Sequence, residues 1–255
     1  MKRHALRLAT LLAVLCGCGD RGNLLSPELT SAPATTAGTQ ISGDDLSQLA
    51  EDFPFKKILC FGDSITLGIT LEAPLGIHAD LSLVEGYVPK LWRRLEARYG
   101  TGLELINAGI GGERTTEGVE RIRFEMRTHN PDLVLLLEGV VDVNNPAPRF
   151  PVVRENLATM MELVHRQGKA IIVGTYPRLN PDGFRTNGWE NVPRLNDVIR
   201  QEANRQGVPI ADHERATPGD LSGQGPDGLH PNDIGYEAIA DSWFEAIVLL
   251  VEGPT

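Results

Sequence analysis

Two things are scarce in this sequence of 255 residues: basic side chains and long apolar runs. Lysine and arginine number 24 against 34 aspartates and glutamates, which leaves a formal charge of −10. Nucleic-acid binding needs a basic face, so this balance argues against a nucleic-acid partner. Beyond the N-terminal segment no apolar run reaches the roughly 18 residues that a membrane-spanning helix requires. With 41% hydrophobic residues, the chain suits one globular domain with a sizeable core.

Cysteine is scarce as well, with three in the whole chain. Cys16 and Cys18 lie near the N-terminus, and Cys60 stands alone in the apolar stretch KKILCFG. A single thiol in such a stretch is most often buried as a small hydrophobic side chain. We therefore expect Cys60 to belong to a buried strand and not to act as a nucleophile.

The N-terminal segment MKRHALRLATLLAVLCGCGD has the layout of a secretory signal: a basic start, a short apolar run and a small-residue exit. Its exit resembles a bacterial lipobox, in which a cysteine after a small residue is lipidated and becomes the mature N-terminus. Leu15, Gly17 and Cys18 fit that pattern, whereas Cys16 is unusual at its position. We expect residues 1–17 to be a lipoprotein signal peptide and lipid on Cys18 to anchor an exported protein at the periplasmic or cell-surface side of a bacterial membrane. An ordinary cleaved signal is the alternative.

Composition and apolar pattern divide the remaining chain in two. Residues 18–52 are rich in Ser, Thr, Ala, Gly and Pro without an apolar period, which predicts a flexible tether. In residues 53–252 five short apolar runs, KKILCFG, LELINAG, DLVLLLEG, KAIIVGTY and GVPIAD, alternate with helical stretches. The helices are expected at about 84–99, 115–128, 150–167, 190–206 and 233–251. This alternation predicts an α/β domain with an open, five-stranded parallel sheet covered by helices on both sides.

The chemistry-bearing residues follow the ends of these strands. GDSIT follows the first strand and carries Ser64, and DGLHPND follows the fifth and carries Asp227 and His230. Because ligands of parallel sheets bind at the carboxyl ends of the strands, these loops are expected to meet. A serine hydroxyl becomes a good nucleophile when a histidine takes its proton and an acid orients that histidine. Ser64, His230 and Asp227 can fill these roles.

Four blocks in this order, GDSIT, NAGIGGE, EGVVD and DGLHPN, resemble the SGNH (GDSL) hydrolase family over about residues 55–250. The resemblance implies a flavodoxin-like three-layer fold and a serine esterase that hydrolyses carboxylic esters through an acyl-enzyme. It implies that Ser64 is the nucleophile, His230 the base and Asp227 the acid, and that the Ser64 N–H stabilises the oxyanion. Gly112 matches the glycine that supplies a second donor, with Gly109 and Gly111 as neighbouring candidates.

The third block departs from the family pattern Gly-x-Asn-Asp, whose asparagine donates to the oxyanion. Here it reads Gly139-Val140-Val141-Asp142, and the valine at the substituted oxyanion position has no hydrogen-bond donor. The oxyanion hole is therefore expected to be impaired, unless Asn144 or Asn145 brings an amide into the gap.

Other classes fit less well. The G-x-S-x-G elbow, the P-loop and the dinucleotide-binding glycine pattern are absent at these loops, and the remaining histidines lack metal-ligand spacing, so no metal or organic cofactor is expected. Arg178 and Arg185 could contact a substrate but are expected to be solvated loop charges.

The expected partner is a small-molecule, glycan or lipid ester. A rival interpretation is a non-catalytic or weakly active module on the same fold that binds glycan or acyl groups; the presence of Ser64, Asp227 and His230 together argues against it.

Overall fold

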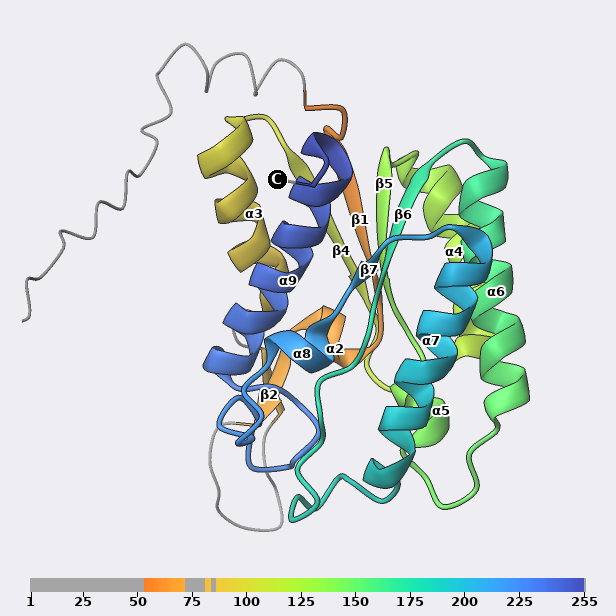
Figure 1. Ribbon diagram of the computed structural model, residues 1–255, viewed down its shortest axis with the longest axis vertical. Coiled ribbons are helices and arrows are strands. Elements are labelled where there is room, and N and C mark those ends of the chain that lie inside the picture. Colours follow the sequence, from red (N-terminus) through yellow and green to blue (C-terminus); the bar gives the residue numbers. More distant parts are fainter. Residues whose placement is uncertain (1–52, 72–80, 84–85, 255) are drawn as a thin grey trace, which may run out of the picture. The chain divides into compact units, whose positions relative to one another are not determined.

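A parallel sheet of five strands forms the centre of the domain (Figure 1). In the computed structural model, which describes residues 53–71, 81–83 and 86–254, the strands lie in the order β4-β1-β5-β6-β7. They are β1 Lys57–Gly62, β4 Glu104–Gly109, β5 Leu133–Leu137, β6 Ala170–Gly174 and β7 Ile210–Ala211. Taken in chain order this is the arrangement 2-1-3-4-5 of flavodoxin-like folds. The expected α/β fold with its five-stranded parallel sheet is confirmed.

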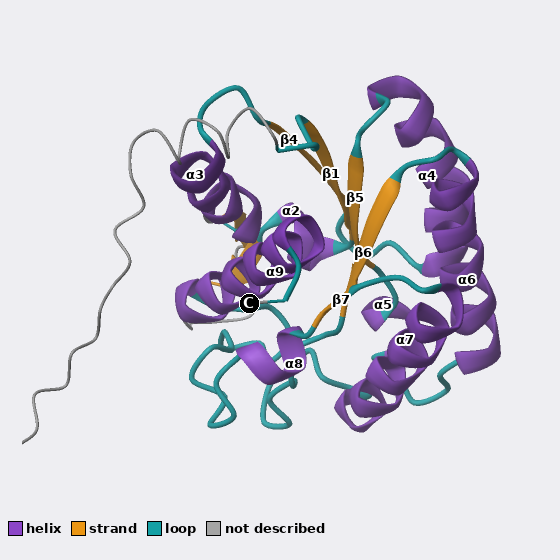
Figure 2. Ribbon diagram, turned by 45° about the horizontal axis from the view of Figure 1, so that its top comes forward, coloured by secondary structure: helices purple, strands orange, loops and turns teal. Residues whose placement is uncertain are grey.

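Helices cover both faces of this sheet (Figure 2). Helices α3 and α9 lie on one face, and α4, α6 and α7 lie on the other. Their bounds are α3 Tyr87–Tyr99, α4 Thr115–His129, α6 Phe150–Arg166, α7 Val192–Gln206 and α9 Asp233–Glu252, close to the ranges expected from the sequence. Within the described part of the chain, no helix combines the length and the apolar character needed to cross a bilayer. The predicted signal peptide, Cys18 and tether lie outside the described residues.

The inner strands are buried, as the continuous apolar runs predicted. Every residue of β5 is buried, and in β1 only Lys57 is partly exposed. Cys60 has no exposed surface, and burial raises the pKa of its thiol well above the ordinary value, which confirms its expected place in the core. The chain moves from β1 to β4 on one side and then returns past β1 to β5, so the strand order reverses between β1 and β5. Ligand sites of such sheets lie at this reversal.

Several one-turn or three-residue elements were not predicted. They are α2 Ser64–Leu67, α5 Val140–Val143, α8 His213–Ala216, the 3-10 turn Trp189–Asn191, and the antiparallel hairpin of β2 Ile69–Leu71 with β3 Leu81–Leu83. Elements this short contain too few residues to show the repeated apolar pattern from which longer helices and strands are recognised.

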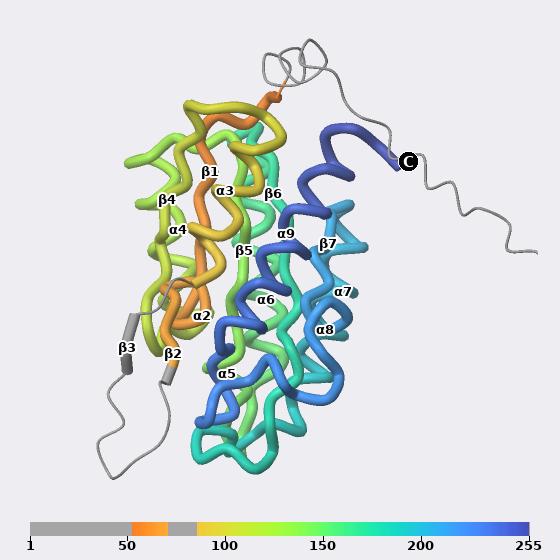
Figure 3. Tube along the Cα trace, turned by 90° about the vertical axis from the view of Figure 1, so that its left-hand side faces the viewer, coloured from red at the N-terminus to blue at the C-terminus, as the bar shows by residue number. Residues whose placement is uncertain are grey.

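Helices α3 and α9 lie side by side on one face of the sheet (Figure 3), and ion pairs join them. The Nζ of Lys90 lies 2.7 Å from Asp233 and 2.6 Å from Glu237. One turn further along, Arg94 contacts Glu237 at 2.5 Å and Asp241 at 2.6 Å. Because α9 begins three residues after His230, this pairing fixes the helix that directly follows the DGLHPND loop.

His213 is buried at the start of α8, with its ring 4.7 Å from the ring of Trp243. Neither of its ring nitrogens has a hydrogen-bond partner among the described residues. Burial lowers the pKa of His213 from 6.5 to about 3, so the side chain is neutral near neutrality.

Candidate active site

Ser64 opens the one-turn helix α2 at the carboxyl end of β1. Asp63 caps this helix, because its carboxylate accepts a hydrogen bond from the N–H of Ile65 at 2.9 Å. Gly62 permits the tight turn, since a Cβ at this position would lie 2.2 Å from a backbone oxygen of β5. The sequence predicted a strand-to-loop turn here and missed the helix, although aspartate is a favoured N-cap residue. The result is a buried serine whose N–H lies at a helix start.

The structure brings Ser64, His230 and Asp227 into one chain of hydrogen bonds. The Nε2 of His230 lies 2.9 Å from the Oγ of Ser64, and its Nδ1 lies 2.6 Å from the Oδ2 of Asp227. The other carboxylate oxygen, Oδ1, accepts from the N–H groups of His230 at 2.9 Å and Leu229 at 3.0 Å. The Asp-x-x-His spacing thus lets the acid orient both the imidazole and the backbone of its own loop.

The electrostatics of Asp227 suit an acid that stays ionised. Burial acts to raise the pKa of this fully buried carboxyl, but the hydrogen bonds from the ring and the N–H of His230 and from Leu229 outweigh it. The pKa of Asp227 is therefore held below its usual value. An ionised carboxylate at Nδ1 keeps the proton on that nitrogen and leaves Nε2 free to accept one.

The DGLHPND loop is fixed at several points. The N–H of Gly225 donates to the carbonyl of His230 at 2.8 Å, and the hydroxyl of Thr70 in β2 donates to the carbonyl of Pro231 at 3.0 Å. Asn232 caps α9 by accepting from the N–H of Gly235 at 3.1 Å. The unpredicted hairpin strand β2 therefore helps to hold the histidine in place.

Two residues that line the cavity have a backbone N–H without an acceptor in the described part of the chain. Among the described residues no acceptor is present for the N–H of Ser64 or of Gly112, and Gly112 adopts a left-handed φ of +78° that suits glycine. Both residues line the cavity. Of the alternative glycines, Gly109 donates its N–H to Asn107 at 3.0 Å, whereas Gly111 also lines the cavity. This leaves Gly112 and Gly111 as candidates for the second donor.

Val141 lies in the short helix α5, where its side chain lines the same cavity and offers no donor. The amide of Asn144 donates instead to the carbonyl of Arg185 at 2.5 Å, and the amide of Asn145 donates to the carbonyl of Asp142 at 2.5 Å. Both asparagine amides thus bind backbone carbonyls, so neither fills the place of the missing third-block amide.

Asp142, the last residue of the third block, binds the start of α4. Its Oδ2 accepts from the N–H of Thr115 at 2.9 Å and its Oδ1 from the hydroxyl of Thr115 at 3.3 Å. The first N–H of α4 is therefore occupied and is not free to bind an oxyanion. Asp142 ties the loop after β5 to the start of α4.

The cavity has a volume of about 500 Å³. Arg185 lines it, donates its own N–H to the carbonyl of Asp227 at 3.0 Å, and places its Nε 3.9 Å from the Asp227 carboxylate. Arg185 is an exposed loop charge, as expected, that also borders this cavity, whereas Arg178 borders a separate cavity of about 410 Å³. The cavity beside Ser64 is lined by Ser64, Ile69, Gly111, Gly112, Val140, Val141, Asn144, Arg185, Leu229 and His230.

This arrangement agrees with a comparison of sequences. Residues 60–238 match the profile of the GDSL-like Lipase/Acylhydrolase family. The chain belongs to this family. The match includes all four blocks, from the GDSIT segment at the end of β1 to the DGLHPND loop, and confirms the resemblance that the sequence suggested.

Individual relatives of this GDSL-family chain are distant. The chain is 28% identical over 120 residues to an arylesterase of Vibrio mimicus. This match covers 46% of the chain and 53% of the relative. The chain is 29% identical over 129 residues to a multidomain esterase of Ruminococcus flavefaciens, where the match covers 48% of this chain and 16% of that protein. An uncharacterized lipoprotein, YqeF of Bacillus subtilis, is 24% identical over 62% of this chain and 71% of its own length. The chain thus spans about half or less of the first two relatives.

Solved structures give the same fold. A lipase/acylhydrolase from Enterococcus faecalis superposes with a TM-score of 0.65 at 26% identity, covering 78% of this chain and 99% of the other. The aryl esterase of M. smegmatis superposes with a TM-score of 0.64 at 22% identity, covering 75% and 98%. The second likeness supports the fold alone.

Sequence reasoning missed a group of buried acids beneath this GDSL-family site. Asp63 accepts a hydrogen bond from the hydroxyl of Tyr176 at 2.7 Å, and burial raises the pKa of Asp63 from 3.8 to about 6. Neither carboxyl oxygen of Glu138 has a partner among the described residues. Burial and the neighbouring carboxylates of Asp63 and Glu113 raise the pKa of Glu138 well above its ordinary value. Asp63 and Glu113 are both buried, and no local sequence pattern marks their burial.

The described residues contain no group of three or more His, Cys, Asp or Glu side chains that could hold a metal ion.

Proposed function

We propose that this chain is a serine esterase that hydrolyses carboxylic esters through an acyl-enzyme on Ser64. The observation that carries the proposal is the continuous hydrogen-bonded path from Ser64 Oγ through His230 to the buried carboxylate of Asp227, at 2.9 and 2.6 Å. These distances are those expected for an activated nucleophile, its base and the group that orients the base. Membership of a family of lipases and acylhydrolases supports the same reaction.

In this mechanism His230 Nε2 takes the proton of Ser64 Oγ as the oxygen attacks the ester carbonyl. The N–H groups of Ser64 and Gly112 stabilise the oxyanion, and His230 then passes the proton to the departing alcohol. Water, deprotonated by the same histidine, releases the acid from the acyl-enzyme. Asp227 stabilises the imidazolium that forms in both halves of the reaction.

The substrate is a small-molecule, glycan or lipid ester. The lining residues Ile69, Val140, Val141 and Leu229 give the cavity apolar walls beside Ser64, which suit an acyl group. Relatives carry the names arylesterase and, among solved structures, acetyl xylan esterase, which makes aryl esters and acetylated sugars the first compounds to test. Lysophospholipids and thioesters complete the screen.

The decisive experiment is labelling with a fluorophosphonate probe, followed by ester hydrolysis. We expect covalent labelling of the purified wild type, and a fall of several orders of magnitude in kcat/KM for Ser64→Ala and His230→Ala with the fold retained by circular dichroism. Asp227→Asn should reduce the rate less than either. The matched control is Ser222→Ala, an exposed serine of the loop after α8. Unlabelled wild type that still binds glycan or acyl compounds would favour the rival interpretation of a non-catalytic module.

We also propose that the protein is exported and held at a membrane by lipid on Cys18. The LCGC segment and the likeness to a Bacillus subtilis lipoprotein support this. The processed wild type should partition with membranes and Cys18→Ser should not, whereas Cys16→Ser should leave the partition unchanged. A processed wild-type protein that is fully soluble and carries no lipid by mass spectrometry would favour an ordinary signal peptide.

A further inference from the structure

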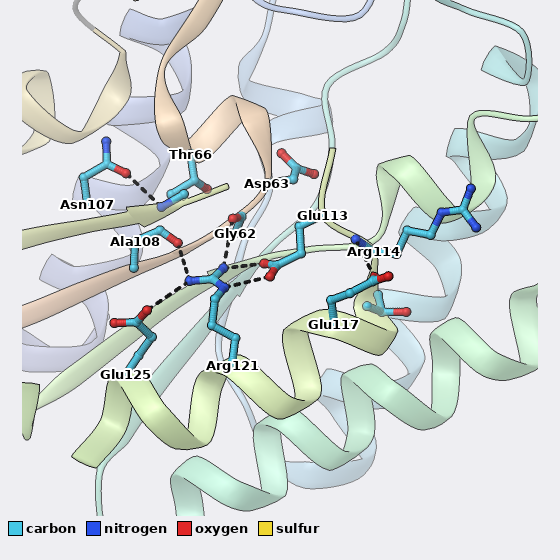
Figure 4. Close-up of polar contacts among 12 residues, drawn as sticks. Gly62, Asp63, Thr66, Asn107, Ala108, Glu113, Arg114, Glu117, Arg121 and Glu125 are labelled. Atoms are coloured by element: carbon cyan, nitrogen blue, oxygen red, sulfur yellow. Dashed lines mark hydrogen bonds and ion pairs between the residues drawn. The ribbon is translucent and has the colours of Figure 1, made fainter. Parts of the chain in front are cut away.

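A buried ion pair joins the loop after β4 to helix α4 (Figure 4). Glu113, which directly follows Gly112, is 7% exposed, and its Oε1 accepts from the Nε of Arg121 at 2.7 Å. Its Oε2 accepts from the Nη2 of the same guanidinium. This two-point geometry fixes the carboxylate relative to the guanidinium plane. We call these two residues the Arg121–Glu113 clamp.

The same guanidinium also holds the ends of two strands. Its Nη1 donates to the carbonyl of Ala108 in β4 at 2.8 Å, and its Nη2 donates to the carbonyl of Gly62 in β1 at 3.3 Å. The ring of Phe61 lies 3.8 Å from the guanidinium carbon, and Glu125 lies 3.5 Å from Nη1 on the side of α4. One side chain of α4 therefore contacts β1, β4 and the loop between β4 and α4.

These contacts flank the two backbone donors of the oxyanion hole. Gly62 lies two residues before Ser64, and Glu113 lies one residue after Gly112. The carbonyl of Gly62 also accepts from the N–H of Ile110 at 2.9 Å, so it already belongs to both segments. The guanidinium is thus a rigid link between the backbone that carries the Ser64 N–H and the backbone that carries the Gly112 N–H.

We propose that Arg121, held by Glu113, is a positioning residue that sets the spacing of the Ser64 and Gly112 N–H groups for the oxyanion. The proposal rests on the serine-esterase function proposed above. The spacing of the two N–H groups matters more in this chain than in a site with an asparagine in the third block. Val141 adds no side-chain donor, so these two N–H groups alone would stabilise the oxyanion. Arginine is required since its planar fork reaches the carboxylate and two carbonyls at once, which the single ammonium group of lysine does not.

The test compares Arg121→Lys and Glu113→Gln with the wild type on one activated ester. Misplaced oxyanion donors should lower kcat by about 10- to 100-fold and change KM by less than about twofold, because the affected interaction is made in the transition state. The matched control is Arg123→Lys, an arginine of the same helix whose side chain is 43% exposed and faces Glu120 at 3.8 Å. It should leave both constants unchanged.

A second measurement separates positioning from mere support of the fold. An alkyl boronic acid, which becomes tetrahedral on Ser64, should bind each clamp variant more weakly by about the factor lost in kcat. The carboxylic acid product, a ground-state ligand, should bind as it does to the wild type. All assays are run well below the unfolding midpoint of each variant, and Glu113→Gln, which keeps the shape of the side chain, is the fallback should Arg121→Lys fail to fold.

The outcomes distinguish the two proposals. A wild type that neither hydrolyses esters nor reacts with the fluorophosphonate would remove the esterase function itself. An active wild type with unchanged kcat and boronate affinity in both clamp variants would overturn the positioning role alone. Equal weakening of boronate and product binding would overturn it as well, since it would show general damage to the cavity.

Discussion

At the scale of single residues, Val141 sets the performance expected of this site. It lies in α5 with its side chain at the cavity, while the amides of Asn144 and Asn145 are bound to backbone carbonyls. Loss of one oxyanion donor typically costs roughly 2.7–4 kcal/mol of transition-state stabilisation. The enzyme should therefore hydrolyse generic esters slowly in spite of its hydrogen-bonded Ser64, His230 and Asp227.

Val141→Asn should raise kcat, by up to about 10²-fold, with little change in KM, because the added amide would act mainly on the oxyanion of the transition state. Steady-state kinetics on one activated ester measure this. Val141→Ala is the control, since it changes the bulk of the side chain without adding a donor.

Asn144→Ala gives the complementary test. Its amide holds the carbonyl of Arg185 and its Oδ1 accepts from the N–H of Gly188 at 3.0 Å, so we expect effects on KM and thermal stability. A kcat loss of about 10²-fold in Asn144→Ala or Asn145→Ala, the size of a lost donor, would show that an asparagine reaches the oxyanion after all. If Val141→Asn and both alanine variants all change kcat by less than about twofold, the family role of the third block does not apply here.

Ser64, Asp227 and His230 could be found from the sequence because each follows a strand whose apolar run is clear, and parallel strands bring such loops together. Arg121, Tyr176 and Glu138 could not. Arg121 lies inside a helix whose pattern gives no sign that its side chain reaches back to the ends of two strands. Glu138 is one of many glutamates, and its burial follows from where β5 ends relative to β1, which no local pattern records.

At the scale of elements, the attachment of α9 to α3 supports the loop that carries His230. The side chain of Lys90 is 3% exposed, whereas its partners on α9, Asp233 and Glu237, are 81% and 41% exposed. Lys90 is thus a buried cation whose charge is balanced by carboxylates at the surface.

Lys90→Met should destabilise the protein by about 1–2 kcal/mol, since it removes charge-assisted hydrogen bonds but leaves the carboxylates in water. Urea unfolding measures the change. Arg166→Met, which removes an exposed pair with Glu162 inside α6, should cost less than about 0.5 kcal/mol. Equal effects of the two substitutions would mean that the α3–α9 contact is held by apolar packing alone.

The long elements were predictable because each carries several repeats of its apolar pattern and a terminal signal, such as Pro151 near the start of α6 or Gly207 after α7. α2 and α5 were not, although both bear residues of the site. One helical turn after a strand is defined by its caps and its contacts with neighbouring loops, and these exist only in the folded chain.

At the scale of the whole molecule, buried ionisable groups pull the pH dependence of stability in opposite directions. His213 has a pKa of about 3 in the fold against 6.5 ordinarily, so its contribution is lost as the pH falls between these values. The pKa of Asp63 is raised from 3.8 to about 6 in the fold, so the contribution of Asp63 to stability is lost as the pH rises through that range. The contributions of His213 and Asp63 oppose each other between pH 3.8 and about 6, where both groups titrate in one of the two states.

Glu138→Gln isolates one of these groups. The folded pKa of Glu138 is raised by burial and by Asp63 and Glu113, so the wild type loses stability as the pH rises above about 4.5. The glutamine variant has no proton to lose, and its advantage over the wild type should widen with pH by up to about 1.4 kcal/mol per unit. Urea unfolding at pH 5 and pH 8 tests this, with the exposed Glu162→Gln as control. A difference that is the same at both pH values would show that the pKa of Glu138 is not raised in the folded protein.

The two ends of the sheet are used differently. Ser64, Gly112, Val141 and His230 all follow the carboxyl ends of strands, while the chain enters the domain at the opposite end, where Phe53 stacks on Tyr99 at 4.1 Å between ring centres. In Figure 1 this entry lies at the top and α2, β2 and α5 at the bottom. The first described residues and the cavity therefore lie at opposite ends of the sheet, so a label or partner joined to the domain at Phe53 would leave the residues around the cavity untouched.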